Sequence, residues 1–263
     1  MNTVKISAVI ITLNEEDNIA RCLESIKNIV DEIVIVDSFS TDKTEEIAAR
    51  YRVKFIKHKF EGYVEQIIFA TGQASNDYIL SIDGDEALSE TLQQSVLEVK
   101  KNWTHDAYSF NRLNNYCGTW IKHGVWYPDI KTRLWDRRKG NWGGENPHYK
   151  VTLNPGSKSK HIKGDLLHYT YKKPFDQYLQ MNRFSEIASK VEFTKGKKTV
   201  PLFHLWLYPI FVFIKSYIIK LGMLDGYYGW ILSKNEAYFR YMKYMKLKFL
   251  WDEHRKATKN KAG

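Results

Sequence analysis

Three acidic side chains lie within four positions of the stretch NDYILSIDGDEALS, namely Asp83, Asp85 and Glu86. They follow an apolar run of the kind that forms a strand buried on both faces. Carboxylates this close repel one another unless a positive charge lies among them. Oxygen ligands suit a hard divalent cation, which keeps several waters and takes phosphate oxygens as further partners. The spacing therefore predicts a divalent-cation site that binds a phosphorylated ligand.

Polar residues also follow two earlier apolar runs. Thr12, Asn14 and Glu15 come after VKISAVII, and Asp37 ends DEIVIVD. Apolar runs alternate with segments of helical period, which predicts a mostly parallel sheet covered on both faces. Ligands of such sheets bind at the carboxyl ends of the strands, so these polar groups are expected at one edge. The expected strands are residues 4–14, 31–38, 53–58 and 77–83, and the expected helices are residues 15–28, 41–51 and 61–75.

The acidic stretch also has a purely structural interpretation. Asp83 and Gly84 would form a turn, and Glu86 would cap a helix that starts near Ser89. The position at the end of a third aligned strand favours the metal site. No P-loop is present and no G-x-G-x-x-G follows the first strand, which argues against a nucleotide-phosphate cradle of either kind.

The chain has 263 residues, enough for one large α/β domain or a domain with an added lobe. Its net charge of +10 suits nucleic acid, anionic lipid or a phosphorylated substrate, or a solvated surface. Cys22 and Cys117 lack metal-type spacing and predict no disulfide framework. The N-terminal stretch lacks the features of a secretory signal, which predicts a cytoplasmic protein.

Residues 201–224, PLFHLWLYPIFVFIKSYIIKLGML, are dense in aliphatic and aromatic side chains, with His204, Pro209 and Lys215 among them. A membrane span needs about 20 predominantly apolar residues. The aromatic content and the basic helix that follows favour a helix lying in the headgroup plane of an anionic membrane. The alternative is a helical hairpin that packs on the catalytic domain.

Three motifs, VIITLNEEDNIARCLESI, EIVIVDSFSTDKT and YILSIDGDEALS, resemble those of the family 2 inverting glycosyltransferases with the GT-A fold. Later segments, including YPDIKTRLWDRRKGNWGG and LLHYTYKKPFDQYLQMNRFSEIAS, are similar to the bacterial branch related to lipopolysaccharide-core β-1,4-glucosyltransferases. The resemblance covers nearly the whole chain. It implies an α/β GT-A domain over residues 1–172, with a nucleotide-binding half (1–101) and an acceptor-binding half (102–172). Residues 173–263 would form a helical, membrane-associating region.

The resemblance also implies roles in binding the nucleotide. Asp37 corresponds to a carboxylate that accepts a hydrogen bond from the uracil or ribose of a UDP-sugar. Thr12, Asn14 and Glu15 would line the same pocket. Relatives carry Lys-Asn where this chain has Ile67-Ile68, so one cationic contact near the donor is lost.

The metal ligands are implied in the same way. Asp85 would bind Mn²⁺ or Mg²⁺ bridging the diphosphate, and Asp83 would contact the ribose or the metal. His168, in LLHYTY, matches a histidine that approaches the metal or the diphosphate. Alternatively, His168 is a core histidine whose ring nitrogens are hydrogen-bonded within the protein.

Inversion requires a general base near the attacking hydroxyl. In this branch the base is an acid beside a histidine, but here Tyr149 follows His148. The nearest carboxylate is Glu145, three residues before His148, and Asp129 is the second candidate.

The resemblance implies transfer of a hexose, with glucose favoured, from a UDP-sugar to a lipid-linked acceptor such as lipopolysaccharide core. An undecaprenyl-linked capsule or O-antigen oligosaccharide is the alternative acceptor. The enzyme would lie on the inner face of the bacterial inner membrane, with no nucleic-acid partner. Two other classes remain as alternatives. A nucleotidyltransferase would show a glycine- and arginine-rich first loop. A basic nucleic-acid-binding protein that recognises RNA would show stacking aromatics on a sheet or a known module.

Overall fold

The computed structural model describes residues 3–145 and 148–262, and it separates into two compact units. The first unit consists of the chain up to Leu113 together with Asp129–Thr170. The second unit consists of Asn114–Pro128 together with the chain from Tyr171 onward. The division expected at residue 172 stays a prediction, and the structure groups Asn114–Pro128 with the C-terminal helices.

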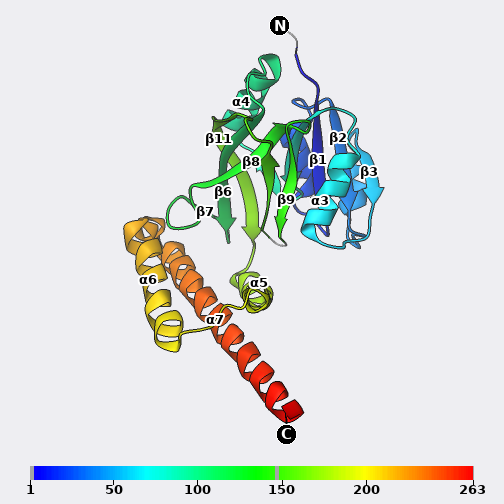
Figure 1. Ribbon diagram of the computed structural model, residues 1–263. Coiled ribbons are helices and arrows are strands. Elements are labelled where there is room, and N and C mark those ends of the chain that lie inside the picture. Colours follow the sequence, from blue (N-terminus) through cyan, green and yellow to red (C-terminus); the bar gives the residue numbers. More distant parts are fainter. Residues whose placement is uncertain (1–2, 146–147, 263) are drawn as a thin grey trace. The chain divides into compact units, whose positions relative to one another are not determined.

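The first unit is built on a mixed sheet with the strand order β3-β2-β1-β4-β8-β6-β11-β5 (Figure 1). The first four of these strands are parallel, and β8 continues the sheet antiparallel to β4. The strands are β1 (Ile6–Thr12), β2 (Glu32–Asp37), β3 (Lys54–Lys57), β4 (Tyr78–Asp83), β5 (Glu86–Leu88), β6 (Ala107–Tyr116), β8 (Asp129–Asp136) and β11 (Ser159–Tyr171). A separate antiparallel hairpin is formed by β9 (Gly140–Glu145) and β10 (His148–Leu153).

The helices of the first unit are α1 (Ile19–Ile26), α2 (Thr44–Ala48), α3 (Tyr63–Gly72) and α4 (Glu90–Lys101). All four strands and three helices expected in the N-terminal half are present, and all three helices are shorter than expected. The expectation that Glu86 caps the next helix is wrong. Glu86 begins β5, and α4 is capped by Ser89, whose hydroxyl accepts a hydrogen bond from the Leu92 N–H at 3.3 Å.

Strand β1 lies at the centre of the core because both of its faces are covered. Ile6, Ala8 and Ile10 pack in one apolar cluster with side chains of α1 and α4. Val9 packs on the other face, where α3 lies (Figure 1), together with Ile67. This two-sided burial explains why the strand is almost continuously apolar in the sequence.

The second unit is mainly helical. Its elements are β7 (Thr119–Ile121), α5 (Pro174–Thr194), η1 (Leu202–Leu207), α6 (Tyr208–Ile214), η2 (Lys215–Ile219), η3 (Gly222–Asp225) and α7 (Gly226–Ala262). Residues Leu202–Ile219 form one continuous helix, here called the apolar helix, that is long and apolar enough to cross a membrane. Pro209 does not break it, because the preceding π-helical turn already displaces the backbone hydrogen bonds.

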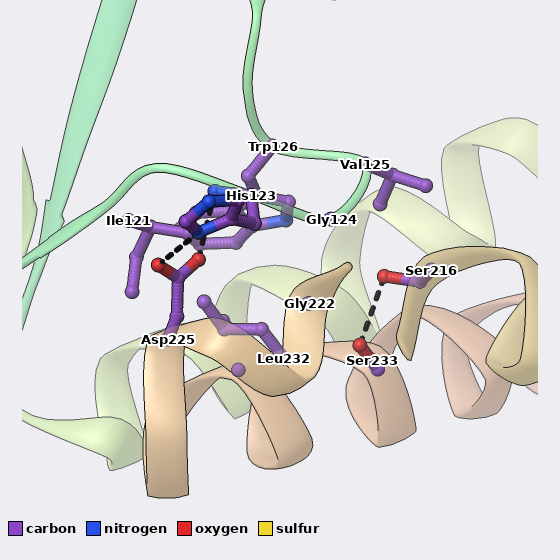
Figure 2. A pocket seen from close by; sticks show the side chains of 11 residues that line it. Ile121, His123, Gly124, Val125, Trp126, Ser216, Gly222, Asp225, Leu232 and Ser233 are labelled. Carbon is purple, nitrogen blue, oxygen red and sulfur yellow. Dashed lines mark hydrogen bonds and ion pairs between the residues drawn. The ribbon is translucent and has the colours of Figure 1, made fainter. Parts of the chain in front are cut away.

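The apolar helix and α7 form a hairpin, and α6 and α7 lie side by side (Figure 1). At its closed end, the Asp225 carboxylate accepts hydrogen bonds from the backbone N–H of His123 at 2.8 Å and of Lys122 at 3.2 Å. Figure 2 shows Asp225 pointing at the His123 ring and the Ser233 hydroxyl pointing at Ser216. Polar contacts therefore fix the turn of this hairpin.

Candidate active site

The turn between β4 and β5 lies against the loop that follows β1. A Cβ atom placed on Gly84 would lie 2.9 Å from Cγ2 of Thr12 and 3.0 Å from Cγ of Glu15. Only glycine allows this close approach without displacing those side chains. The turn that carries Asp83 and Asp85 is therefore packed against two of the residues expected to bind the nucleotide.

Asp37, at the end of β2, is fully buried and joins this edge. Its carboxylate accepts hydrogen bonds from the Thr12 hydroxyl at 2.9 Å and from the Ser40 N–H at 2.8 Å. The Ser40 hydroxyl donates a third hydrogen bond to the same carboxylate. These donors hold the carboxylate in one orientation at the carboxyl end of the parallel strands. Asp37 and Thr12 thus lie together, as the sequence predicts.

Hydrogen bonds made by Asn14 and Glu15 connect the loop after β1 with the segment after β2. Asn14 has a positive φ of 56°, which Asn tolerates better than most residues, and its Oδ1 accepts from the Thr41 N–H at 2.8 Å. The Glu15 N–H donates to the Thr44 hydroxyl at 2.8 Å, and its carboxylate accepts from Asn18 at 2.9 Å. Asn14 is exposed at this edge and Glu15 is half-buried.

Asp83 pairs with a buried arginine from β8. Its Oδ2 lies 3.3 Å from a guanidinium nitrogen of Arg133, whose side chain is only 6% exposed. Its Oδ1 is buried and accepts no hydrogen bond from any residue that the structure describes. Burial raises the pKa of Asp83, the neighbouring Glu86 adds to the rise, and Arg133 opposes it. A buried carboxylate oxygen without a donor is a position at which a cation or a ligand hydroxyl would be stabilised.

Asp85 and His168 form a pair beside this group. Nε2 of His168 lies 3.1 Å from Oδ2 of Asp85, and Nδ1 contacts the Thr170 hydroxyl at 3.0 Å. Burial disfavours the charged ring, but the Asp85 carboxylate outweighs it and raises the pKa of His168. Strands β5 and β11 produce this contact through antiparallel pairing that places His168 opposite Glu86. Two of the three side chains expected to bind metal, Asp85 and His168, are therefore adjacent.

Within the described residues, no three His, Cys, Asp or Glu side chains gather closely enough to hold a metal by themselves. A dication bound here would need other ligands. Mg²⁺ bound through one or two carboxylates, waters and substrate phosphates has this requirement. The residues present fit a cation that binds together with a diphosphate.

Asp129, the second candidate base, is held by two cations. Arg112 contacts Oδ2 of Asp129 at 2.8 Å, and Lys131 contacts Oδ1 at 2.9 Å. Arg112 also reaches Glu86 at 3.5 Å, and Glu86 accepts a hydrogen bond from the Asp83 N–H at 2.9 Å. A chain of charges thus connects Asp129 to the acidic turn.

Glu145, the first candidate base, ends β9, and its side chain lies outside the described residues. The hairpin that carries it is fixed near its base by Trp142, which is 6% exposed. The Trp142 indole N–H donates to the Thr71 hydroxyl at 3.1 Å, and its ring packs edge-on against Trp135.

The sequence interpretation missed the two arginines that hold the acids, Arg112 and Arg133. Arg133 stands within the run TRLW, and a charged residue in a buried strand must pair with an opposite charge. An arginine within a predicted buried strand therefore indicates that an acidic partner exists, but not which residue it is. Ile67, one of the two residues that replace Lys-Asn, is fully buried in the core, and Ile68 is 42% exposed.

Comparison with known proteins agrees with this arrangement. The profile of Glycosyl transferase family 2 matches residues 7–156. An uncharacterized glycosyltransferase of Rickettsia prowazekii is 32% identical over 94% of this chain and 87% of its own length. LpsC of Rhizobium meliloti, a lipopolysaccharide core biosynthesis glycosyltransferase, is 27% identical over 92% of this chain and 91% of its own length.

A solved structure shares the fold. The mannosyltransferase PcManGT of Pyrobaculum calidifontis, in complex with GDP-Man and Mn²⁺, matches with a TM-score of 0.55. It is 12% identical and covers 96% of this chain and 88% of its own. The expected GT-A fold is confirmed, and so is the resemblance to family 2 and its lipopolysaccharide-core members. The chain belongs to glycosyl transferase family 2 and is a glycosyltransferase.

Proposed function

We propose that this glycosyltransferase moves a hexose, with glucose as the first candidate, from a UDP-sugar to a lipid-linked glycan such as lipopolysaccharide core, with inversion and with Mn²⁺ or Mg²⁺. One observation carries the proposal. The turn containing Asp83 and Asp85 packs against Thr12 and Glu15, beside the buried Asp37. Nucleotide-binding and cation-binding groups are thereby adjacent at the edge where ligands of such sheets bind.

The donor would be held by groups from β2, from the turn between β4 and β5, and from β11. Asp37 would accept a hydrogen bond from the uracil or ribose, because its oxygens keep lone pairs beyond those used by Thr12 and Ser40. Asp85 and His168, with Asp83 beside them, would hold the cation together with water and the diphosphate of the donor. When bound, the cation neutralises the charge that develops on the departing diphosphate.

His168 is oriented for this task by its contact with Thr170. A hydrogen bond to one ring nitrogen fixes which nitrogen faces the metal. Protonation of the ring removes the lone pair that a metal needs, and the Asp85 pair favours the protonated ring. Metal binding at this ring would therefore compete with its protonation.

The acceptor hydroxyl would be deprotonated by Glu145 or by Asp129. Both oxygens of Asp129 are occupied by ion pairs with Arg112 and Lys131, so an incoming acceptor hydroxyl would have to compete with these two cations. This competition favours Glu145 as the base.

The lipid-linked acceptor is supported by the likeness to LpsC and by the apolar helix. A net charge of +10 suits the anionic inner leaflet, and we place the enzyme on the cytoplasmic face of the inner membrane.

A donor screen tests the proposal. Purified protein is incubated with UDP- and GDP-sugars, with Mn²⁺, Mg²⁺ or EDTA, and donor hydrolysis is measured. Metal-dependent hydrolysis of one UDP-hexose is expected. Equal use of GDP- and UDP-sugars would show that the uracil assignment of Asp37 is wrong, and hydrolysis that persists in EDTA would refute the metal site.

A further inference from the structure

The apolar helix exposes most of its surface. His204, Tyr208 and Ser216 contact α7, and Val212 and Ser216 are the two buried residues of this helix. Of the window Leu202–Ile219, 11% of the residues are buried. An exposed apolar surface of this extent marks a partner or a membrane. The exposed apolar side chains are Leu202, Phe203, Trp206, Leu207, Ile210, Phe211, Ile214, Ile218 and Ile219.

Two contacts attach this helix to α7 near its two ends. The Ser233 hydroxyl donates to Ser216 at 2.9 Å in a buried position (Figure 2). The ring of His204 stacks on Tyr244 at 4.1 Å. Because of these contacts, the α7 segment between Ser233 and Tyr244 would stay beside the apolar helix at a membrane.

That α7 segment is strongly charged. It carries Lys234, Glu236, Arg240 and Lys243. If the apolar helix crossed a bilayer, these charges would be carried into the hydrocarbon, where ionised side chains are costly. If the apolar helix instead lies along the membrane surface, the charged side chains of this α7 segment remain among the headgroups and water.

Positive charge accompanies the exposed face. Lys215 lies on the apolar helix, Lys220 follows its end, and Lys198 precedes its start, and all three are exposed. Lysines at this position attract the anionic headgroups of a bilayer, whereas a second copy of the same basic surface would repel them. The charge pattern selects an anionic leaflet as the occupant of this face.

We infer that the apolar helix lies in the headgroup plane of an anionic leaflet, with both of its ends on the same side of the membrane. The apolar residues enter the acyl boundary, and the charged α7 segment stays outside it. This inference specifies how the proposed enzyme would reach a lipid-linked acceptor, and it rests on the proposed function only for that acceptor.

Vesicle flotation of the full chain, without donor or metal, tests the docking. Binding to phosphatidylethanolamine vesicles that contain phosphatidylglycerol is expected, with weaker binding to phosphatidylcholine. The double variants Trp206→Glu/Ile210→Glu and Lys215→Glu/Lys220→Glu should each bind at least about tenfold more weakly. Matched changes in the first unit, Ile68→Glu and Lys101→Glu/Lys160→Glu, should leave binding unchanged. Circular dichroism establishes that each variant is folded.

Cysteine labelling tests the orientation. In a Cys117→Ser background, Lys198→Cys and Leu224→Cys place thiols beyond the two ends of the apolar helix. An impermeant maleimide should label both in inverted inner-membrane vesicles and neither in intact spheroplasts. Labelling of one of them in spheroplasts would show that the helix spans the membrane and would overturn the inference.

A dimer is the remaining alternative outcome. If the full chain is dimeric by light scattering without lipid, becomes monomeric in Trp206→Glu/Ile210→Glu, and ignores vesicles, the face is an interface between copies. Donor hydrolysis is measured separately. A protein that hydrolyses a UDP-sugar but ignores vesicles refutes only this inference, and one that docks but uses no donor refutes only the proposed function.

Discussion

At the level of single residues, the acids of the candidate site differ in what holds them. Asp37 accepts hydrogen bonds from uncharged donors, Asp83 lies against Arg133, Asp85 lies against His168, and Asp129 lies between two cations. Neutral donors orient a carboxylate for a ligand, whereas an ion pair occupies its oxygens with a charged partner. The same functional group can therefore serve in nucleotide binding, metal binding or structure.

Asp85→Asn should abolish Mn²⁺-dependent UDP binding, because the amide oxygen is a much poorer ligand for a hard cation. The melting temperature should change little, since the Asp85 side chain is partly exposed. Isothermal titration with and without Mn²⁺ measures the effect. Asp77→Asn, just before the same strand β4, is the matched control. UDP affinity that stays metal-dependent and normal in Asp85→Asn would remove Asp85 from the metal site.

Asp83 gives a pH prediction. Burial raises its pKa in the folded state above the unfolded value of about 3.9. A raised pKa contributes stability below the unfolded pKa, and this contribution is lost as the pH rises through the folded pKa. The unfolding free energy of the wild type minus that of Asp83→Asn should therefore fall as the pH rises from about 4 toward neutrality. Chemical denaturation at several pH values measures it, and a difference that rises with pH would contradict the burial argument.

The candidate bases give a third prediction. Positioned proton transfer contributes about 10²–10⁴-fold to rates. Glu145→Gln should lower kcat by that factor and leave donor binding unchanged, because glutamine keeps the size but cannot take the proton. Asp129→Asn is the comparison. A near-normal Glu145→Gln with an inactive Asp129→Asn would transfer the role to Asp129.

At the level of elements, a glycine in β11 fixes how α4 starts. Gly164 has φ +99°, and a Cβ atom there would lie 2.3 Å from the Leu92 backbone nitrogen. Gly164→Ala should destabilise by at least about 2 kcal/mol, since strain and overpacking each cost about 1–3 kcal/mol. Thermal unfolding measures it. Gly72→Ala, with nothing within 4 Å, is the control and should be neutral or slightly stabilising. An unchanged melting temperature in Gly164→Ala would contradict this packing.

The N-terminal half of the sheet could be predicted because its strands are buried on both faces and read as apolar runs, as in β1 and β4. The acids follow these strands directly, so the sequence could place Asp37, Asp83 and Asp85 at the ends of β2 and β4. Their cationic partners could not. Arg133 lies 50 residues from Asp83, and strand order and register between β4 and β8 bring the two together. Such long-range pairing leaves no local pattern.

At the level of the whole molecule, ligand binding should raise thermal stability. A ligand at 100 times its Kd stabilises a folded protein by about 2.7 kcal/mol, which corresponds to roughly 5–10 °C in a chain of this size. UDP with Mn²⁺ should produce this shift and UDP with EDTA should not, by differential scanning fluorimetry. Shifts of equal size in EDTA would indicate nucleotide binding that does not require the cation.

The β9–β10 hairpin has a consequence for evolution. Within the described residues its strands pair with each other and not with the main sheet, and Trp142 fixes its base. Substitutions in β9 or β10 therefore disturb no strand that carries Asp37, Asp83 or Asp85. With Glu145 as the proposed base, a duplicated gene could acquire a new acceptor preference by changing this hairpin while keeping its ancestral donor. Descendants of one such enzyme would then diversify a cell-surface glycan while drawing on the same pool of activated sugar.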